Sequence, residues 1–351
     1  TVRVAVIGSG LAGLTVCDRL VHAGDVEVVV IDENPVGTQN ASAAAAGLLH
    51  KFSPRGKKVF MADRAFDRAT AFIGEFAPNC IVRRGPIVRA ALSMQQKKDY
   101  AKAAHSYPAE VELIEGTAVH KAAAGLNAEA ALIIKDSLVI NVQHYLQTLW
   151  QRACKTGRAS YSCREIKDVH SLLLKSEFDK VVVAAGHRCA ELVPGLQLDQ
   201  KLGRNVIFRP RSGQGTPLAE PRISGKYVVP RADGGILAGA TFESRLSIDG
   251  GENTVQNALK EMGDKIYDLY SPLHSDYDPV DVTVGIRGIP VRPPGKAPIP
   301  FVLRASPNVW LLGGLASRGL LHHAVFGDFL AEALIKDDVK YIPAELQLPA
   351  P

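Results

Sequence analysis

The first residues that could take part in chemistry are three glycines and an aspartate near the N-terminus. Gly8, Gly10 and Gly13 form a G-x-G-x-x-G pattern between a strand-like run and a helical run. Asp32 follows nineteen residues after the last glycine, at the end of the next strand-like run. In such a unit the glycines allow a tight turn, approach of a pyrophosphate and close helix packing, while the acid accepts ribose hydroxyls. The pattern predicts a dinucleotide without a 2′-phosphate, either NAD or FAD.

A second glycine-rich segment, Trp310 to His323, joins a strand-like run to an apolar helix near the C-terminus. The backbone there has no side chains at Gly313, Gly314 and Gly319, so a ligand could approach it closely, and Arg318 adds a cation. The ring of a flavin is flat and buried, and its reduced form is negatively charged along one edge. Backbone N–H groups at a helix start suit that edge, so the segment favours FAD over NAD. The alternative is that the glycines only let a strand and a helix cross closely.

The hydrophobic pattern predicts the elements that position these residues. A strand, a helix over Leu11 to His22 and a second strand open the chain, and "FDKVVVAAG" and "NVWLLGG" read as further buried strands. Helices are expected over Val59 to Phe76, Val142 to Lys155 and Ala324 to Ile335. The expected fold is α/β, with a Rossmann-type FAD-binding domain and an interleaved α+β substrate domain built on an antiparallel sheet. The FAD-binding domain is predicted at 1–80, 141–200 and 280–351, and the substrate domain at 81–140 and 201–279.

Composition narrows the class of protein further. The 351 residues are 46% hydrophobic and 22% charged, with a net charge of +5, as in ordinary globular proteins. No apolar run is long enough to predict a membrane span. The five cysteines form no C-x-x-C pair and no metal-ligand spacing, so we expect reduced thiols, no disulfide and no metal. We therefore expect a reducing compartment, either the cytoplasm or an organelle matrix or stroma. The start at Thr1 raises the expectation that an N-terminal targeting segment was removed.

Several motifs together resemble the D-amino-acid-oxidase-like FAD oxidoreductases. They are the G-x-G-x-x-G turn with Asp32, "ASAAAAGLLHKFSP", "VVVAAG", "GGILAGATFE", "GIRG" and "GGLASRGLLHHAVFGDFLAEAL", which together span nearly the whole chain. Within this family the chain is most similar to the glycine-oxidase branch. There it most resembles the FAD domain of the bifunctional enzymes that modify the wobble uridine of tRNA, because of "GATFE" and "SRGL". The resemblance implies FAD as the cofactor.

The candidate cofactor-binding residues combine the two glycine segments with positions that the resemblance implies. The implied positions cover the flavin phosphates and ring, the end of a later parallel strand, and the pyrimidine edge of the flavin. The full set is Gly8, Ser9, Gly10, Leu11, Ala12, Gly13, Asp32, Glu33, Ser42, Ala45, Ala46, Gly47, Leu48, Ala185, Gly186, Gly313, Gly314, Ser317, Arg318, Gly319 and Leu320.

Three residues are candidates for catalysis. Arg287 in "VGIRGIP" matches the arginine that grips the substrate carboxylate in the resembling enzymes, and a guanidinium fork suits a carboxylate. The alternative for Arg287 is a structural ion pair. His50 and His322 fall in segments expected near the flavin, where an imidazole could tune the amine or the reduced ring. For each histidine a hydrogen-bonded structural role is the alternative.

The expected function is FAD-dependent oxidation of a C–N bond in an amine that carries a carboxylate, with hydride transfer to flavin N5. The expected substrate is the carboxymethylaminomethyl group of a tRNA wobble uridine or a free small amino acid such as glycine or sarcosine. One alternative is a binding or assembly subunit with a structural flavin in a larger protein complex, motivated by basic clusters such as Lys51 to Lys58 and Arg204 to Arg211. An NAD-dependent dehydrogenase is a third reading. The sequence leaves the oligomeric state undetermined.

Overall fold

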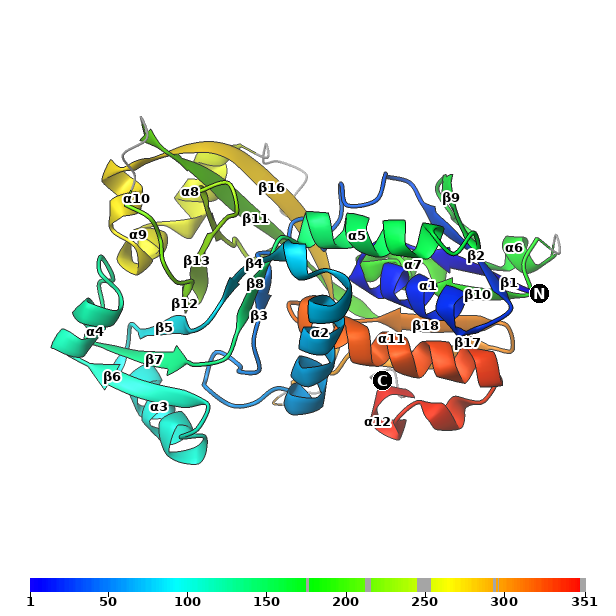
Figure 1. Ribbon diagram of the computed structural model, residues 1–351, viewed down its shortest axis with the longest axis horizontal. Coiled ribbons are helices and arrows are strands. Elements are labelled where there is room, and N and C mark those ends of the chain that lie inside the picture. Colours follow the sequence, from blue (N-terminus) through cyan, green and yellow to red (C-terminus); the bar gives the residue numbers. More distant parts are fainter. Residues whose placement is uncertain (175–176, 212–215, 245–253, 293–294, 296, 348–351) are drawn as a thin grey trace.

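The computed structural model describes residues 1–174, 177–211, 216–244, 254–292, 295 and 297–347. The molecule has two lobes, each built on one β-sheet (Figure 1). The N-terminus lies in the lobe with the smaller sheet, which also holds the last long helix. Two long paired strands, β11 (Leu198–Pro210) and β16 (Tyr277–Pro290), reach from the second lobe toward the first.

A six-stranded sheet forms the first lobe, in the order β17-β18-β10-β1-β2-β9. All neighbours in it are parallel except β17 and β18, which are antiparallel. Alternate residues of its strands point to opposite faces, so Val4 and Val6 join one core cluster while Ala5 and Ile7 join another. The strands are β1 (Val2–Ile7), β2 (Val26–Asp32), β9 (Ala159–Cys163), β10 (Lys180–Val183), β17 (Phe301–Ser306) and β18 (Val309–Gly313).

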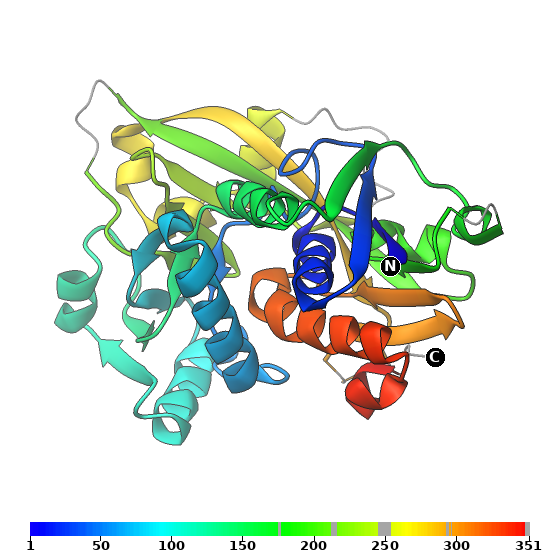
Figure 2. The same cartoon turned by 45° about the vertical axis from the view of Figure 1, so that its right-hand side comes forward.

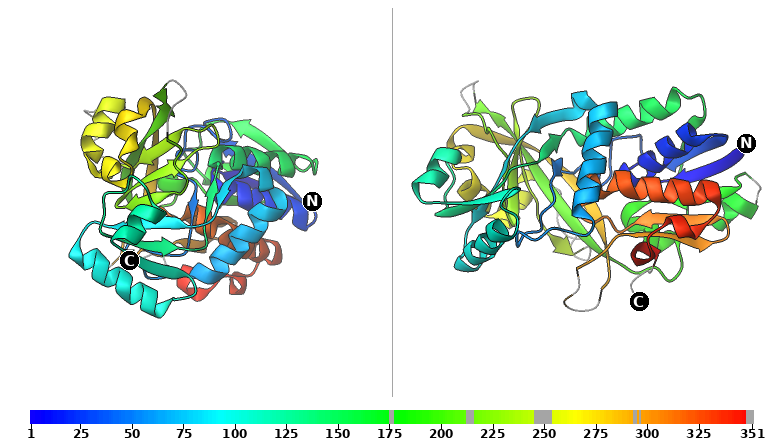
Figure 3. Two further views of the ribbon diagram at one scale, coloured as in Figure 1. Left: turned by 60° about the vertical axis from the view of Figure 1, so that its left-hand side comes forward. Right: turned by 60° about the horizontal axis from the view of Figure 1, so that its bottom comes forward.

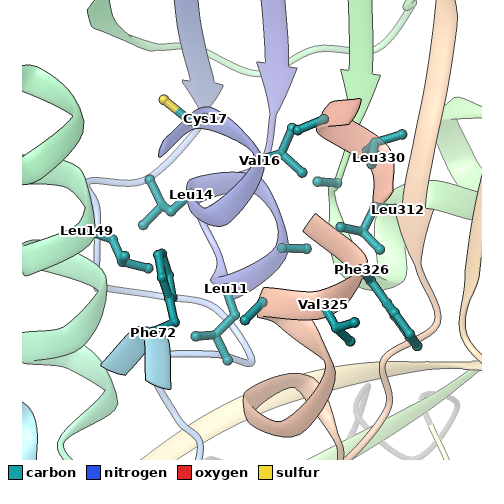
Figure 4. Packing of buried hydrophobic residues seen from close by; sticks show 14 of the residues in the cluster. Leu11, Leu14, Val16, Cys17, Phe72, Leu149, Leu312, Val325, Phe326 and Leu330 are labelled. Atoms are coloured by element: carbon teal, nitrogen blue, oxygen red, sulfur yellow. The ribbon is translucent and has the colours of Figure 1, made fainter. Parts of the chain in front are cut away.

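Helices cover both faces of this sheet. On one face lie α1 (Leu11–Ala23), α2 (Ala62–Phe76), α5 (Val142–Cys154) and α11 (Gly319–Lys336), whose apolar side chains meet in one core (Figure 4). On the other face lie α6 (His170–Leu174) and α7 (Cys189–Leu192). A short helix, α12 (Ala344–Gln347), packs beside β17.

The crossing of α1 and α11 is close, and the two helices lie side by side (Figure 2). Gly327 makes this possible, because a Cβ atom on it would lie 2.6 Å from the Thr15 methyl carbon. The crossing matters for the site because both helices begin at the same edge of the sheet.

The second lobe contains a nine-stranded, mostly antiparallel sheet, with the order β15-β11-β14-β13-β12-β5-β7-β6 and β16 paired to β11 (Figure 3). Helices α8, α9 and α10 pack on one part of it, while α3 packs near β6 and β7. The strands are β5 (Ile87–Ala91), β6 (Val111–Glu115), β7 (Ala130–Ile134), β12 (Arg222–Ser224), β13 (Lys226–Pro230), β14 (Ile236–Gly239) and β15 (Glu243–Ser244). The helices are α3 (Met94–Ser106), α4 (Thr117–Ala122), α8 (Val255–Met262), α9 (Lys265–Leu269) and α10 (Pro272–Ser275).

A small sheet lies between the lobes, with the order β3-β8-β4, formed by β3 (Leu48–Leu49), β8 (Leu138–Ile140) and β4 (Ile81–Arg84). All six strands of the first lobe's sheet come from the ranges 1–80, 141–200 and 280–351. Strands β11 and β16 run across the predicted boundaries at residues 200 and 280. The exact division into domains stays a prediction.

The α/β fold class is confirmed, and most predicted helices differ only at their ends. Asn141 caps α5 as expected, since its side chain accepts a hydrogen bond from the His144 amide. The last long helix begins at Gly319, five residues before the predicted start at Ala324. Its first turn was hidden because glycine and arginine there do not look like the start of an apolar helix. In the described part of the chain no helix is both long and apolar enough to cross a membrane.

Candidate active site

A cavity of about 660 Å³ lies where the carboxyl ends of the parallel strands face the nine-stranded sheet. The ends of β1, β2, β10 and β18 contribute to one side of it, and β11, β13 and β16 contribute to the other. This edge of a parallel sheet is where ligands bind in doubly wound folds, because the helix starts and flexible loops gather there. Except for Ser9, Gly13 and His322, every candidate residue from the sequence lines this one cavity.

Each of the three positions in the first turn has a glycine for a different structural reason. Gly8 has a φ of +108°, which a residue with a side chain rarely adopts. A Cβ atom on Gly13 would lie 1.9 Å from the Gly8 carbonyl oxygen, so the helix could not pack as it does. A Cβ atom on Gly10 would meet only the side chain of Ser42, at 2.9 Å, because this position faces the cavity. Gly10 therefore leaves the α1 start open to a ligand.

Asp32 holds the same turn from the end of β2. One carboxylate oxygen accepts hydrogen bonds from the Ser9 amide at 2.7 Å and the Ser9 hydroxyl at 2.8 Å. The other oxygen accepts from the Asn34 amide at 3.0 Å. Asp32 and Glu33 line the cavity, whereas Ser9 acts from behind as the partner of Asp32. The carboxylate can orient the turn and still present lone pairs to a ribose.

Arg188 is a residue at this end of the cavity that the sequence did not reveal. Its guanidinium lies 3.2 Å from a Glu33 carboxylate oxygen and 2.8 Å from a Glu165 oxygen. These three residues come from three separate strand ends and line the cavity together. No local pattern could have found them, because their spacing in the sequence is irregular.

Ser42 and the residues from Ala44 to Leu48 line the cavity. Gly47 has a φ of +76°, and a Cβ atom there would lie 2.0 Å from the Ile140 carbonyl oxygen. The Ser42 hydroxyl accepts a hydrogen bond from the Leu11 amide at 3.1 Å, which places it at the start of α1. The serine thus marks the point where a phosphate would meet the helix N-terminus.

The second glycine segment also lines the cavity, but the reason for two of its glycines differs from the expectation. A Cβ atom on Gly313 would lie 2.7 Å from the Phe301 ring, and one on Gly314 would lie 2.4 Å from Pro290. Packing against the neighbouring strand β17 and the end of β16 therefore requires these two glycines, which is a different contact from the crossing of a strand and a helix that was the alternative. The backbone from Leu312 to Leu320 nevertheless faces the cavity and leads into α11.

His322 lies outside the cavity lining, and the structure offers no support for a catalytic role. Its Nε2–H donates to the Phe60 carbonyl oxygen at 2.9 Å, and its ring stacks on Phe326 with centroids 4.8 Å apart. Burial lowers its pKa to about 4. His322 was placed near the flavin because it follows Gly319 closely, but the turn of the helix directs it toward Phe60, just before α2. These contacts agree with the alternative for His322, a hydrogen-bonded structural role.

His50 and Arg318 lie together at the cavity wall. An Arg318 Nη atom lies 3.4 Å from His50 Nε2, and the other donates to the Phe52 carbonyl oxygen at 2.8 Å. His50 is buried, and burial together with the charges of Arg318 and Arg89 keeps its pKa well below 6.5. The imidazole is therefore neutral at physiological pH and cannot act as a cationic group there.

Arg287 extends from β16 over the nine-stranded sheet at the other wall. A Cβ atom on Gly203 would lie 2.6 Å from one of its Nη atoms, so the glycine leaves room for the guanidinium. Its Cζ lies 5.8 Å from the centre of the Phe242 ring. No carboxylate oxygen lies within 4 Å of Arg287 among the residues that the structure describes. The ion pair that was its structural alternative is therefore not found there.

Tyr227 and Asn205 are further lining residues that sequence reasoning missed. The Tyr227 hydroxyl donates to the Asn205 side-chain oxygen at 2.6 Å, and the Asn205 amide donates to the Ala44 carbonyl at 2.6 Å. Burial raises the pKa of Tyr227 to about 12, so the phenol stays protonated. The pair connects the sheet of the second lobe to the loop that carries Ser42.

Comparison with known proteins agrees with this geometry. Residues 3–333 match the family of FAD dependent oxidoreductases named DAO, and the chain belongs to this family. FAD is therefore its cofactor, which excludes the reading of an NAD enzyme. The chain is 27% identical over 344 residues to the bifunctional protein MnmC of tRNA 5-methylaminomethyl-2-thiouridine biosynthesis from Maricaulis maris. That match covers 95% of the chain but 52% of MnmC, so the chain spans about half the length of this relative.

Solved structures share the fold at low sequence identity. Glycine oxidase from Geobacillus kaustophilus is 18% identical, with a TM-score of 0.76 and 96% of each chain covered. Iminodiacetate oxidase from Chelativorans sp. BNC1 is 17% identical, with a TM-score of 0.74 and 99% of each chain covered. The sequence-based resemblance to the family, its glycine-oxidase branch and MnmC is confirmed.

Proposed function

We propose that the protein oxidises the C–N bond of an amine that carries a carboxylate. The observation that carries the proposal is Arg287, a guanidinium in the cavity wall without an acidic partner in the described part of the chain. An unpaired cation in a concave site suits a carboxylate, because the planar fork gives two charge-assisted hydrogen bonds and fixes the orientation.

The residues present fit FAD along one side of the cavity. The turn at Gly10 and the start of α1 would hold the diphosphate, Asp32 and Glu33 would hold the ribose, and the backbone before α11 would face the ring. When bound, FAD supplies the acceptor for two electrons. Arg287 would then hold the substrate carboxylate so that the carbon next to nitrogen faces that acceptor.

The remaining chemistry needs few protein groups. The amine must be unprotonated, and removal of a hydride from its α-carbon together with a proton from nitrogen leaves an imine. Water then adds to the imine and releases a carbonyl compound and the shorter amine. Since neither step needs a charged acid or base, a neutral His50 is compatible with turnover.

For the substrate we propose the carboxymethylaminomethyl group of a wobble uridine, with a free small amino acid as the competing choice. Similarity to MnmC supports the first, because that relative is named for tRNA 5-methylaminomethyl-2-thiouridine biosynthesis. The fold shared with glycine oxidase supports the second. Both substrates carry the carboxylate that Arg287 would bind.

The alternative of an assembly subunit loses part of its motivation in the structure. Lys51 and Lys58 pair with Asp63 and Glu110. Likewise, Arg204 pairs with Glu243, Arg209 with Asp233 and Arg211 with Asp278. Much of the basic surface that could attract a partner is therefore neutralised within the chain.

The test is an anaerobic titration of the FAD-loaded protein, followed by the bleaching of the flavin absorbance. We expect reduction by an RNA hairpin bearing 5-carboxymethylaminomethyluridine or by N-methylglycine. Arg287→Ala should lower kcat/KM by about 10-fold to 150-fold, since a charged hydrogen bond is worth about 1.5–3 kcal/mol. Arg211→Ala is the matched control, because Arg211 directly follows β11 and pairs with Asp278 at the surface; it should leave kcat/KM unchanged. Unaltered turnover in Arg287→Ala would refute the anchoring role.

A further inference from the structure

Two arginines from distant parts of the chain converge on one carbonyl oxygen behind the cavity wall. Arg318, at the start of α11, donates to the Phe52 oxygen at 2.8 Å. Arg89, on β5 of the other lobe, donates to the same oxygen at 3.4 Å. Arg89 is only 4% exposed and does not line the cavity, whereas Arg318 and the neighbouring His50 do.

This arginine pair has no counter-charge in the described part of the chain. No carboxylate oxygen there lies within 4 Å of either guanidinium, and Arg89 Nε is buried without a hydrogen-bond partner. Burial, and then the charge of Arg89, lowers the pKa of Arg318 to about 10. Two buried like charges that share one neutral acceptor are unfavourable unless something negative completes the site.

A neighbouring arginine shows what a completed site looks like in the same sheet. Arg222 lies on β12 beside β5, with Ile223 in register with Arg89. Arg222 is as buried as Arg89, but its guanidinium lies 3.0 Å from a Glu220 carboxylate oxygen. A buried arginine in this sheet can therefore have an acidic partner, and Arg89 differs from Arg222 in lacking one among the described residues.

His50 lies beside the arginine pair. Its Nδ1 lies 3.2 Å from the Phe52 amide nitrogen, and its Nε2 lies 3.4 Å from an Arg318 Nη atom. The neutral ring has one acceptor nitrogen, so it can accept only one of these two hydrogen bonds, and it brings no negative charge. Within the described part of the chain, the two guanidiniums therefore share one carbonyl oxygen and have no anionic partner.

We propose that Arg89 and Arg318 form one positive site that is completed by an anionic group bound in the cavity beside His50. Arg318 touches that group, and Arg89 is a positioning residue that holds the Phe52 carbonyl and adds its charge from behind. The anionic group is either the reduced flavin, which is negatively charged along its pyrimidine edge, or the substrate carboxylate, which this site would then bind in place of Arg287. The inference rests on the proposed placement of FAD in this cavity, and it is testable without turnover.

The test compares Arg89→Met, Arg89→Lys and the matched control Arg222→Met in the FAD-loaded protein. Two quantities are measured without an amine: the two-electron midpoint potential of the flavin, and the Kd of acetate from its effect on the oxidised flavin spectrum. We expect Arg89→Met to change at least one of the two quantities. Either the Kd of acetate rises by tenfold or more, or the midpoint potential falls by about 30 mV or more, which corresponds to a tenfold change in the equilibrium constant. Arg89→Lys should stay near the wild type, because it retains the charge. Should Arg89→Met fail to fold, Arg89→Gln takes its place.

The two quantities separate the two sources of the anion. A lower potential with unchanged acetate affinity assigns the site to the reduced flavin, and the reverse assigns it to the substrate carboxylate. The proposal is overturned if both quantities match the wild type in a folded, FAD-loaded Arg89 variant. It is also overturned if Arg222→Met shifts them equally, because the effect would then come from sheet packing. Failure of every amine to reduce the flavin would refute the proposed function while leaving both measurements interpretable.

Discussion

Two glycines of the first turn allow a paired prediction. Substitution of Gly13 should lower the stability of the protein, whereas substitution of Gly10 should lower its affinity for FAD. In Gly13→Ala the new methyl group would lie 1.9 Å from the Gly8 carbonyl oxygen, where contact normally begins beyond about 3 Å. The obstacle is backbone, so the helix or the turn must move by roughly an ångström. In Gly10→Ala the methyl group meets only the Ser42 side chain and the cavity.

The expected magnitudes follow from these contacts. Overpacking of a tight core costs about 1–3 kcal/mol, and removal of a helical glycine returns at most about 1 kcal/mol. Gly13→Ala should therefore lose roughly 1–2 kcal/mol of stability and roughly 2–8 °C of Tm in the FAD-free protein. Gly10→Ala should keep the Tm of the FAD-free protein, but its methyl group blocks the diphosphate. A similar steric penalty of about 1–3 kcal/mol would raise the Kd of FAD about 5-fold to 150-fold.

The assays are thermal denaturation of the FAD-free protein and titration of FAD by its fluorescence. Gly74→Ala is the control, because this glycine lies within α2 and its Cβ would meet only Arg84 Nη at 3.8 Å. The Gly74→Ala variant should have a Tm equal to or above that of the wild type, and it should bind FAD with the wild-type Kd. If Gly13→Ala melts at the wild-type temperature, or Gly10→Ala binds FAD as tightly as the wild type, the steric reasoning is wrong.

Two further predictions concern Asp32 and the buried histidines His322 and His323. Asp32→Asn replaces an oxygen that accepts two hydrogen bonds from Ser9, so we expect at least a tenfold weaker Kd for FAD by fluorescence titration; an unchanged Kd would contradict this. Burial lowers the pKa of His322 and of His323 to about 4, below the unfolded value near 6.5. Their contribution to stability is therefore present above pH 6.5 and is lost as the pH falls toward 4. Urea denaturation should show a smaller stability difference between pH 7 and pH 5 in His323→Gln than in the wild type; an equal difference would count against the reasoning.

Local features were predictable because their causes are local. The φ of Gly8, the packing of Gly13 and the position of Asp32 follow from a strand that turns at once into a helix. Hydrophobic periodicity likewise located α1 and α5 within one residue at each end. These features need only neighbouring residues to be decided.

Features that depend on distant contacts were not predictable in the same way. Arg188, Tyr227 and Asn205 reach the cavity only because separate strand ends meet there. His322 looked like a site residue from its position in the sequence, but the direction of α11 points it away. The packing that requires Gly313 and Gly314 comes from Phe301 and Pro290, which are residues of neighbouring segments in the fold.

The amino-acid sequence by itself therefore determined the fold class, the family and the glycine turn at which we propose that the dinucleotide binds. Tertiary structure decided which cations are neutralised within the chain and which have no acidic partner among the described residues. Arg211 has Asp278 of a distant segment beside it, whereas Arg89, Arg287 and Arg318 have no carboxylate within 4 Å in the described part of the chain. The physical reason is that backbone conformation is set by adjacent residues, while the partner of a charge is set by whichever segments the fold brings together.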